Sequence, residues 1–406
     1  MKRFISSLML ISVLFFSCNK TNDFVDKNSD LLTKSAKEVT EANNAFAFEF
    51  FNEIANAEAE DNFMVSPLSL SLALGMTYNG ANGDTKTAFD NTLNYSSSLT
   101  EVNQFSKDLI DKLSGSSDGS VMEIANSIWI EETFPVKEDF VNLNRKYYNA
   151  EVENLNFSDP ATVDIINEWV SEKTYDKIPT IIEKIEPEEV MFLINALYFN
   201  ANWKYEFDPE YTENKSFYKS PDETTEAEMM TLTADIEYTE NELFTSVILP
   251  YKQDKFSMVI LLPNSQKTTD NIVSELNSQN WENWRNEYDT TEVSVNIPKF
   301  KLKYKNKLND ELIEMGLGIA FSGRADFSNI SNIPLNISYV LQKTFIDVNE
   351  EGTEAAAVTV VGMEYTSIEP QPITFNANKP FIYMIKENVT GSICFMGRLG
   401  DPKYEE

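Results

Sequence analysis

Residues 350–363, EEGTEAAAVTVVGM, restrict the possible fold more than any other part of the chain. Side chains alternate between the two faces of a strand. On one face this spacing places only small or uncharged residues: Thr353, Ala355, Ala357, Thr359, Val361 and Met363. Glu354 and the nearby Glu364 fall on the other face. No proline interrupts 350–369, but two glycines and an alanine run make a weak strand. The segment can therefore join a sheet without being obliged to stay there.

The motif alone fits a short core strand or a piece of helix equally well, because alanine favours helix. Its flanks favour a different interpretation. Residues 364–372 are polar and turn-like, and Ile373-Thr374-Phe375 resumes strand character. A strand-competent segment that is held at both ends and has an exposed tip suits a loop offered to a protease.

The run FIDVNEEGTEAAA at 345–357 resembles the reactive-loop hinge of the serpins, protease inhibitors that act as suicide substrates. Further segments resemble serpin motifs, in family order, over about residues 43–402. They are NFMVSPLSLSLALGM (62–76), GANGDT (80–85), LINALYFNANW (193–203), ADFSNI (325–330), and NKPF (378–381) through FMGR (395–398). The sequence departs from the family pattern at Asp176 and Asn329, where glycine is common, and at Gln342, where histidine is usual.

The resemblance implies an α+β serpin fold in one domain, residues 39–406. This fold has a large, mostly antiparallel, five-stranded sheet A, two further sheets, about eight or nine helices and an exposed reactive loop. Residue patterns agree with it. Phe46, Phe50 and Ile54 recur at helical spacing, which predicts a core-facing helix within 39–57. Apolar runs predict buried strands at 121–130, 190–199 and 256–263, and residues 308–316 are expected to be helical.

The resemblance also implies a function, the suicide inhibition of serine proteases, and extends to cysteine proteases as further targets. The cleaved loop would insert into sheet A and trap the acyl-enzyme. The hinge would comprise Glu350, Glu351, Gly352, Thr353, Glu354, Ala355, Ala356, Ala357, Val358 and Thr359.

Loop length places the scissile bond, since the usual seventeen residues from Glu350 end at Thr366. We therefore expect cleavage between Thr366 and Ser367, with cleavage after Tyr365 or Met363 as alternatives. No Lys or Arg lies between Gly352 and Asn378, so a trypsin-like pocket has nothing to bind. Elastase-, subtilisin- or chymotrypsin-like targets are expected instead.

Four residues match the family's shutter, a hydrogen-bonded cluster beneath the central strands: Ser66, Ser69, Asn195 and Gln342. Asn195 is the one polar residue in an apolar strand, and its amide must find partners or cost about 1–3 kcal/mol. Gln342 can both donate and accept, so it can take part in the network in place of histidine.

Charge and composition exclude several functions. The net charge of −32 repels nucleic acid, heparin-like polyanions and anionic lipid headgroups. The absence of histidine removes His-dependent triads, the usual His-bearing zinc sites and the ordinary pH switch near neutrality. No nucleophile elbow, Gly-rich phosphate loop or metal-ligand spacing appears. We expect a monomer that is not an enzyme and has no catalytic residues, metal or cofactor.

The N-terminus indicates export. Lys2 and Arg3 precede an apolar run, 4–16, that is too short to span a bilayer comfortably. Ser17-Cys18 follows and resembles a bacterial lipoprotein signal, which makes residues 1–18 a signal peptide ending at a lipidated Cys18. Polar residues 19–38 would then form a tether. The protein would be lipid-anchored to a bacterial membrane or cell surface. The alternative is a conventional signal peptide and a secreted or periplasmic protein.

Two other functions compete with inhibition. A non-inhibitory serpin could act as a binding or chaperone module, but its hinge would be expected to carry charged or bulky residues on the inward face. A hydrolase or glycan-binding lipoprotein is the third hypothesis. Paired carboxylates carry no signal for it, because they are unavoidable in a chain with 65 acidic residues.

Overall fold

A computed structural model describes residues 34–58, 62–117, 119–353 and 372–404. Within these ranges nine α-helices alternate with strands and short turns of 3-10 or π helix. The α-helices are α1 (Lys34–Ala57), α2 (Pro67–Tyr78), α3 (Gly83–Thr92), α4 (Leu99–Leu113), α5 (Glu138–Tyr148), α6 (Ala161–Lys173), α7 (Thr269–Glu275), α8 (Ser278–Arg285) and α9 (Asn309–Leu312). The short turns are η2 (Pro209–Tyr211), η3 (Lys252–Asp254), η4 (Ile313–Leu317) and η5 (Gly318–Phe321).

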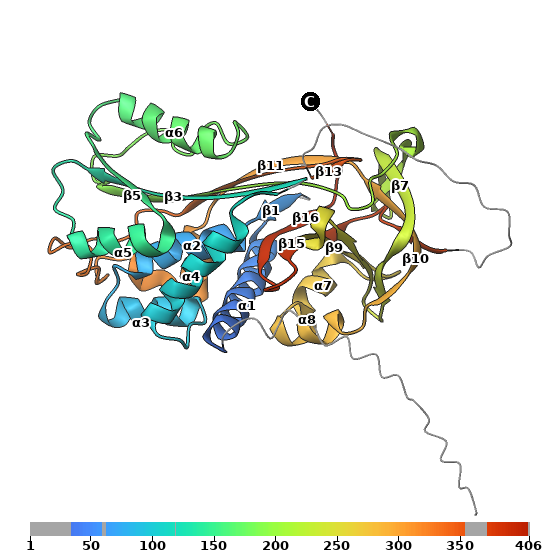
Figure 1. Cartoon of the computed structure of the whole chain (residues 1–406), viewed down its shortest axis with the longest axis horizontal. Helices are drawn as coiled ribbons and strands as arrows, with labels where there is room; N and C mark the ends of the chain where they lie inside the picture. Colours follow the sequence, from blue (N-terminus) through green and yellow to red (C-terminus); the bar gives the residue numbers. More distant parts are fainter. Residues whose placement is uncertain (1–33, 59–61, 118, 354–371, 405–406) are drawn as a thin grey trace, which may run out of the picture.

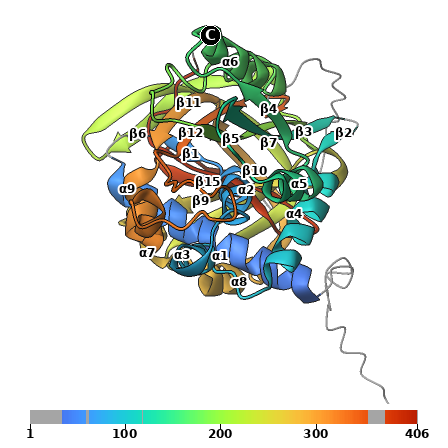
Figure 2. The ribbon, with the colours of Figure 1, turned by 90° about the vertical axis from the view of Figure 1, so that its left-hand side faces the viewer.

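The central sheet runs in the order β11-β12-β13-β5-β3-β2, with β4 beside β3, and this order can be followed across Figure 2. Five of its strands have at least five residues, and all described pairings except β3 with β4 are antiparallel. The strands are β2 (Gly115–Ser117), β3 (Ser120–Glu131), β4 (Glu151–Leu155), β5 (Met191–Asn202), β11 (Phe300–Lys307), β12 (Leu341–Val348) and β13 (Gly352–Thr353). These five strands, in a mostly antiparallel sheet that the short β2 and β13 also join, confirm the expected sheet A.

The other described strands form one continuous hydrogen-bonded sheet, in which the long strand β7 links the two ends. Its strands are β1 (Phe63–Val65), β6 (Glu213–Ser220), β7 (Glu223–Glu240), β8 (Phe244–Pro250), β9 (Phe256–Pro263), β10 (Asp289–Pro298), β14 (Ile373–Asn376), β15 (Phe381–Glu387) and β16 (Ile393–Leu399). Helix α6 lies on one face of the central sheet, while α2, α4 and α5 lie on the other (Figure 1). The α+β architecture expected from the sequence is confirmed.

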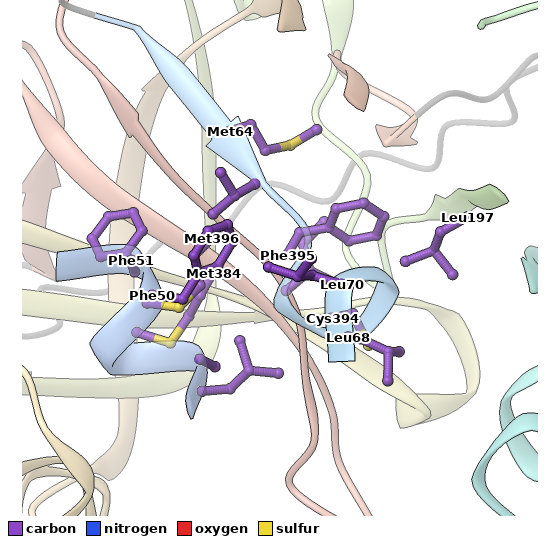
Figure 3. Close-up of a cluster of buried hydrophobic side chains, with 14 of the residues drawn as sticks. Phe50, Phe51, Met64, Leu68, Leu70, Leu197, Met384, Cys394, Phe395 and Met396 are labelled. Carbon is purple, nitrogen blue, oxygen red and sulfur yellow. The ribbon is translucent and has the colours of Figure 1, made fainter. Parts of the chain in front are cut away.

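The core lies between the central sheet, helices α1 and α2, and the β15–β16 hairpin. Phe50 and Phe51 of α1 are fully buried beside Met384 and Met396 of the hairpin, and Figure 3 shows these side chains gathered around the start of α2. The Phe46 ring stacks on Phe50 at 5.8 Å between centroids. The aromatic residues predicted at helical spacing therefore form the face through which α1 packs into the core.

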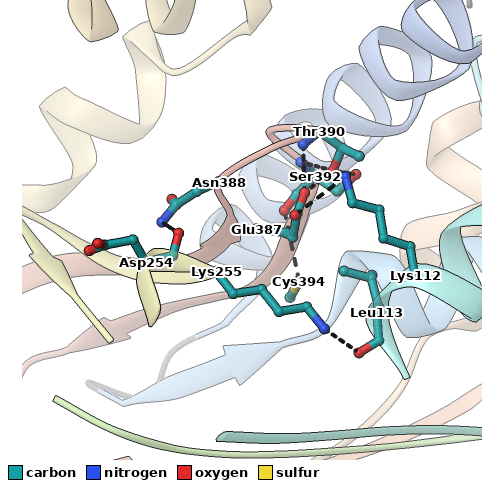
Figure 4. A network of polar contacts seen from close by, with 9 residues as sticks. All are labelled: Lys112, Leu113, Asp254, Lys255, Glu387, Asn388, Thr390, Ser392 and Cys394. Atoms are coloured by element: carbon teal, nitrogen blue, oxygen red, sulfur yellow. Dashed lines mark hydrogen bonds and ion pairs between the residues drawn. The ribbon is translucent and has the colours of Figure 1, made fainter. Parts of the chain in front are cut away.

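Polar groups fix the end of the β15–β16 hairpin (Figure 4). The carboxylate of fully buried Glu387 accepts hydrogen bonds from the backbone N–H and the hydroxyl of Thr390, and Lys112 of α4 lies 3.6 Å away. Lys255 donates to the carbonyl of Leu113. Burial raises the pKa of the neighbouring Cys394 thiol, which keeps it protonated and unreactive.

The element boundaries agree with the sequence where strong local signals exist. Ser66 caps α2 by accepting from the Ser69 N–H, as its place before Pro67 predicts. Asp176 has a φ of 62°, a conformation that aspartate tolerates better than most residues in place of glycine. Helix α1 begins at Lys34, so the last five residues of the expected tether are helical.

We predict that Phe50→Ala lowers the free energy of unfolding by about 3–5 kcal/mol, because it removes a fully buried ring from a packed core. Urea titration followed by tryptophan fluorescence measures the change. Replacing exposed Tyr211 with alanine is the matched control and should change stability by less than about 0.5 kcal/mol. Equal effects of the two substitutions would contradict the described packing.

Candidate functional site

The central sheet is interrupted between β5 and β12. On this side, β5 and β12 pair only with the two-residue strand β13, through Ala201, Asn202 and Val348. The remainder of each facing edge has no strand partner in the described part of the chain. Between these edges lies a cavity of about 530 Å³, here called the slot. Its lining includes residues 189–197, which run into β5, residues 338–343, which run into β12, and side chains of α2. The slot can accept an additional strand.

The hinge lies in the gap between the same two edges, further along the strands than the residues that line the slot. Gly352 is level with Asn202, and Thr353 lies between Ala201 and Val348. A Cβ atom on Gly352 would lie 2.1 Å from the carbonyl oxygen of Ala201, so only glycine fits there. The Thr353 hydroxyl is buried and lies 2.6 Å from the Tyr251 hydroxyl. The first inward-facing residue of the hinge is therefore already packed as a strand residue.

Trp203 fastens the turn between β12 and β13. Its backbone N–H donates to the carbonyl of Glu351 and its indole N–H donates to the carbonyl of Asn349, at 2.8 and 2.9 Å. The indole stacks on Tyr251, with 4.5 Å between ring centroids. Burial raises the pKa of Tyr251, although the hydrogen bond with Thr353 opposes this shift. Tyr251 is thus a neutral hydroxyl that orients the hinge.

Glu350 is held by charge as well as by hydrogen bonding. Its carboxylate accepts from the Thr212 hydroxyl at 2.8 Å and lies 3.2 Å from the ammonium of Lys299. Burial tends to lower the pKa of Lys299, but Glu350 and Glu228 outweigh it, and the net shift is upward. Lys299 therefore stays charged, and the base of the hinge is fixed to the sheet.

The structure joins three of the four shutter residues. Gln342 and Ser66 exchange two hydrogen bonds: the Ser66 N–H donates to the Gln342 side-chain oxygen at 2.9 Å, and the amide of Gln342 donates to the Ser66 carbonyl at 2.8 Å. The Ser66 hydroxyl donates to the Cys394 carbonyl and accepts from the Ser69 N–H. Gln342 therefore connects β12 to the start of α2 across the bottom of the slot.

Asn195 is bonded separately from the other three. Its amide donates to the Asn126 side-chain oxygen at 2.8 Å, and Asn126 donates in turn to the Tyr148 carbonyl. The Asn195 side-chain oxygen is buried and has no partner among the described residues. Asn195, Ser69 and Gln342 all line the slot, so the cluster surrounds the cavity with one acceptor still open.

The remaining expected site residues lie outside the described residues. They are Glu354, Ala355, Ala356, Ala357, Val358, Thr359, Met363, Tyr365, Thr366, Ser367 and Cys18. The structure adds Trp203, Tyr251 and Lys299, whose roles the sequence analysis missed. Trp203 ends a motif that had been recognised only as a strand, while Tyr251 and Lys299 have no local signal because their partners are more than 50 residues away. In the described ranges no acidic or sulfur side chains gather as metal ligands, and no helix has the length and apolarity needed to cross a membrane.

Comparisons with known proteins agree with this geometry. The family model described as serpin (serine protease inhibitor) matches residues 41–402. A serpin-like protein of Methanosarcina acetivorans is 36% identical, over 97% of this chain and 97% of its own. The native-state crystal structure of the thermophilic serpin tengpin has a TM-score of 0.82 and 34% identity, covering 89% of this chain and 94% of that one. Human thyroxine-binding globulin complexed with its hormone has a TM-score of 0.83 and 25% identity, covering 91% of this chain and all of its own.

A sheet with a vacant strand position and a tethered segment at its entrance defines the serpin class of fold. The match over most of the chain places the protein itself there: this chain belongs to the serpin family. Many members of the family inhibit proteases, and the family is not one of catalytic enzymes.

We predict that Gln342→Ala lowers the free energy of unfolding by about 1–3 kcal/mol, because it leaves the buried N–H of Ser66 without a partner and removes one of the two hydrogen bonds to the Ser66 carbonyl. Differential scanning calorimetry measures the shift in melting temperature. Gln104→Ala is the control, since Gln104 makes only an exposed bond to Asp108. A variant as stable as the parent would show that this bridge does not hold β12 in place.

Proposed function

We propose that the protein is a suicide-substrate inhibitor of serine proteases that traps the acyl-enzyme by inserting its cleaved reactive loop into the slot. The observation that carries this proposal is the slot itself, with Thr353 already paired at its entrance. The chain would contribute no catalytic residue of its own. After cleavage, residues beyond Thr353 would be free to continue along the unpaired edges of β5 and β12.

The observed register fixes where each inserted residue would lie. Thr353 pairs with Ala201 in an antiparallel ladder, so continuation places Ala355 level with Phe199 and Ala357 level with Leu197. On the β12 side the same two residues fall level with Ile346 and Thr344, because Thr353 pairs with Val348. The alternation of 350–363 would then direct its uncharged residues into the core and Glu354 outward.

If the register of Thr353 continued along both strands, Thr359 would lie between Asn195 and Gln342. A threonine hydroxyl can donate to the Asn195 oxygen that has no partner in the described chain. Insertion would thus complete the shutter cluster. This supports a role for Asn195 and Gln342 as acceptors of the loop.

The free energy available from insertion is sufficient for trapping. About ten new backbone hydrogen bonds at roughly 0.5–1.5 kcal/mol each give on the order of 10 kcal/mol. A typical protease domain has about 5–15 kcal/mol of stability, so insertion can distort the active site of an attached enzyme. Losing one oxyanion-hole donor slows hydrolysis by about a hundred-fold or more, and the acyl bond would persist.

The target follows from the loop sequence. We place the scissile bond between Thr366 and Ser367, which suits an elastase-like or subtilisin-like pocket, with Tyr365 as the site for a chymotrypsin-like enzyme. Lipidation at Cys18 and export of a monomer remain part of the proposal, on the sequence alone. Non-inhibitory binding is the second candidate, since thyroxine-binding globulin shares the fold with its ligand bound.

Thr353→Arg should convert the inhibitor into a substrate, because arginine would have to be buried beside Tyr251 for the hinge to insert. The yield of SDS-stable complex with pancreatic elastase should fall at least tenfold while loop cleavage continues. Glu354→Arg is the matched control: its side chain would face solvent and the yield should hold. Complex formation by Thr353→Arg at the parent's yield would refute insertion. Absence of complex with the parent across all three protease types would favour the binding module.

Thr359→Val should destabilise only the loop-cleaved form, because the valine leaves the Asn195 oxygen unsatisfied after insertion. We expect a loss of about 1–3 kcal/mol in that form. Calorimetry of cleaved parent and cleaved variant gives the difference, and the intact proteins serve as the control because they should melt alike. The cleaved parent should itself melt well above the intact protein. Cleaved forms that melt together would argue against the register given above.

A further inference from the structure

Strand β11 forms the edge of the central sheet on the far side of β12 from the slot (Figure 2). From Lys299, the residue before β11, every second residue is a lysine: 299, 301, 303, 305 and 307. The intervening residues face the core: Phe300 is buried, and Tyr304 packs on Phe63. The lysines therefore share the outer face of the sheet.

The backbone of β11 also alternates. The Leu308 N–H donates to Val340, in register with the ladder to β12, so the even-numbered N–H groups point toward β12. The odd-numbered groups point away, as two bonds show: Lys299 donates to the Glu228 carbonyl and Lys301 to the Lys403 carbonyl, both at 2.8 Å. The corresponding N–H groups of Lys303, Lys305 and Lys307 have no acceptor among the described residues. In the described part of the chain, two of these five outward N–H groups are therefore bonded and three are open.

The C-terminal segment shows how the edge is used. Lys403 accepts from Lys301, and the Tyr404 ring is covered by the ammonium groups of Lys299 and Lys301, at 4.3 and 5.0 Å from its centroid. The C-terminal segment is thus already hydrogen-bonded to the first part of β11. The open part continues in line with it.

The open part is a local concentration of positive charge. Lys303, Lys305 and Lys307 are all exposed, and Lys305 lies opposite Lys343 on β12. One acidic side chain, Glu183, pairs with Lys305 at 2.7 Å, and it is itself 75% exposed. In a chain with a net charge of −32, this stripe is a local site that attracts negative charge.

We propose that the open edge at Lys303–Lys307 binds an extended acidic peptide segment of a partner protein by strand addition. Three N–H donors spaced two residues apart require carbonyl acceptors at the spacing of a strand, about 6.6–6.8 Å. Acidic side chains at alternate positions of the added strand would lie directly opposite the lysines. The same lysines repel apolar or basic edges, which accounts for the selectivity. This site is separate from the slot and does not depend on the proposed inhibition.

The test uses the full chain and a fluorescein-labelled peptide with alternating threonine and glutamate, nine residues long, followed by fluorescence anisotropy in about 50 mM salt. We expect a Kd in the tens of micromolar that rises with salt. The variant K303S/K305S/K307S should bind at least about tenfold more weakly. The control K146S/K215S/K267S removes three exposed lysines elsewhere and should bind within about twofold of the parent. Should the first triple variant fail to fold, as judged by its melting curve, Lys305→Ser and Lys146→Ser give the same comparison.

A second peptide separates strand addition from simple attraction between charges. It has the same side chains on a backbone that is N-methylated at every residue, so it cannot pair as a strand, and we expect at least about fivefold weaker binding. Equal binding of the two peptides would overturn the proposal in favour of a polyanion patch. Inorganic polyphosphate displacing the labelled, unmethylated peptide as well as its unlabelled form does would have the same meaning. Unchanged binding by K303S/K305S/K307S would also overturn it. Self-association of the chain through these lysines, measured by sedimentation, would assign the edge to a second copy instead.

Discussion

The structure depends on two strand edges that face each other without pairing. The edges of β5 and β12 carry backbone donors and acceptors toward a cavity of about 530 Å³, where a sheet would ordinarily satisfy them with a neighbouring strand. Buried backbone groups of this kind are nearly always paired in folded proteins. The sheet is therefore less stable than it would be with one more strand.

Two sets of contacts hold the edges in this state. At the entrance, Trp203, Tyr251 and Lys299 fix the turn that leads into β13, so only Gly352 and Thr353 lie between the strands. At the other end, Gln342 ties β12 to Ser66 at the start of α2. Both sets are hydrogen bonds and ion pairs of modest individual strength. They can be exchanged for the contacts of an inserted strand without disturbing the apolar core beneath.

The sequence predicted those parts of the fold that have a local cause. Apolar runs at 121–130, 190–199 and 256–263 became β3, β5 and β9, because buried strands need no partner-specific pattern to be recognised. The helix expected at 308–316 was only partly correct: α9 ends at Leu312 and a π turn follows, in which Gly316 has a φ of 104°. That φ is incompatible with a regular helix, and periodicity cannot reveal it.

The site was predicted less completely. The hinge and shutter residues were expected from the resemblance, but the hydrogen bonds and ion pairs that they make were not predicted. Ser66 and Gln342 are 276 residues apart, and Lys299 meets Glu350 only after the chain has folded around β12. No sequence signal marks the slot, because it arises from the absence, in the described chain, of a strand between β5 and β12 beyond the short β13. The slot exists because of the order in which the strands pair. Pairing between strands that are far apart in the sequence is decided by the whole fold and not by local residues.

The attachment of the hinge to β12 has a kinetic consequence. A segment joined to the slot's entrance samples it at an effective concentration in the millimolar range, as short flexible linkers do. The corresponding segment of a neighbouring molecule meets the same two edges only at the concentration of the protein in solution. For the insertion proposed above, dilution would therefore favour the intramolecular reaction. Crowding many copies together, as on a surface, would narrow that advantage and favour chains linked end to end.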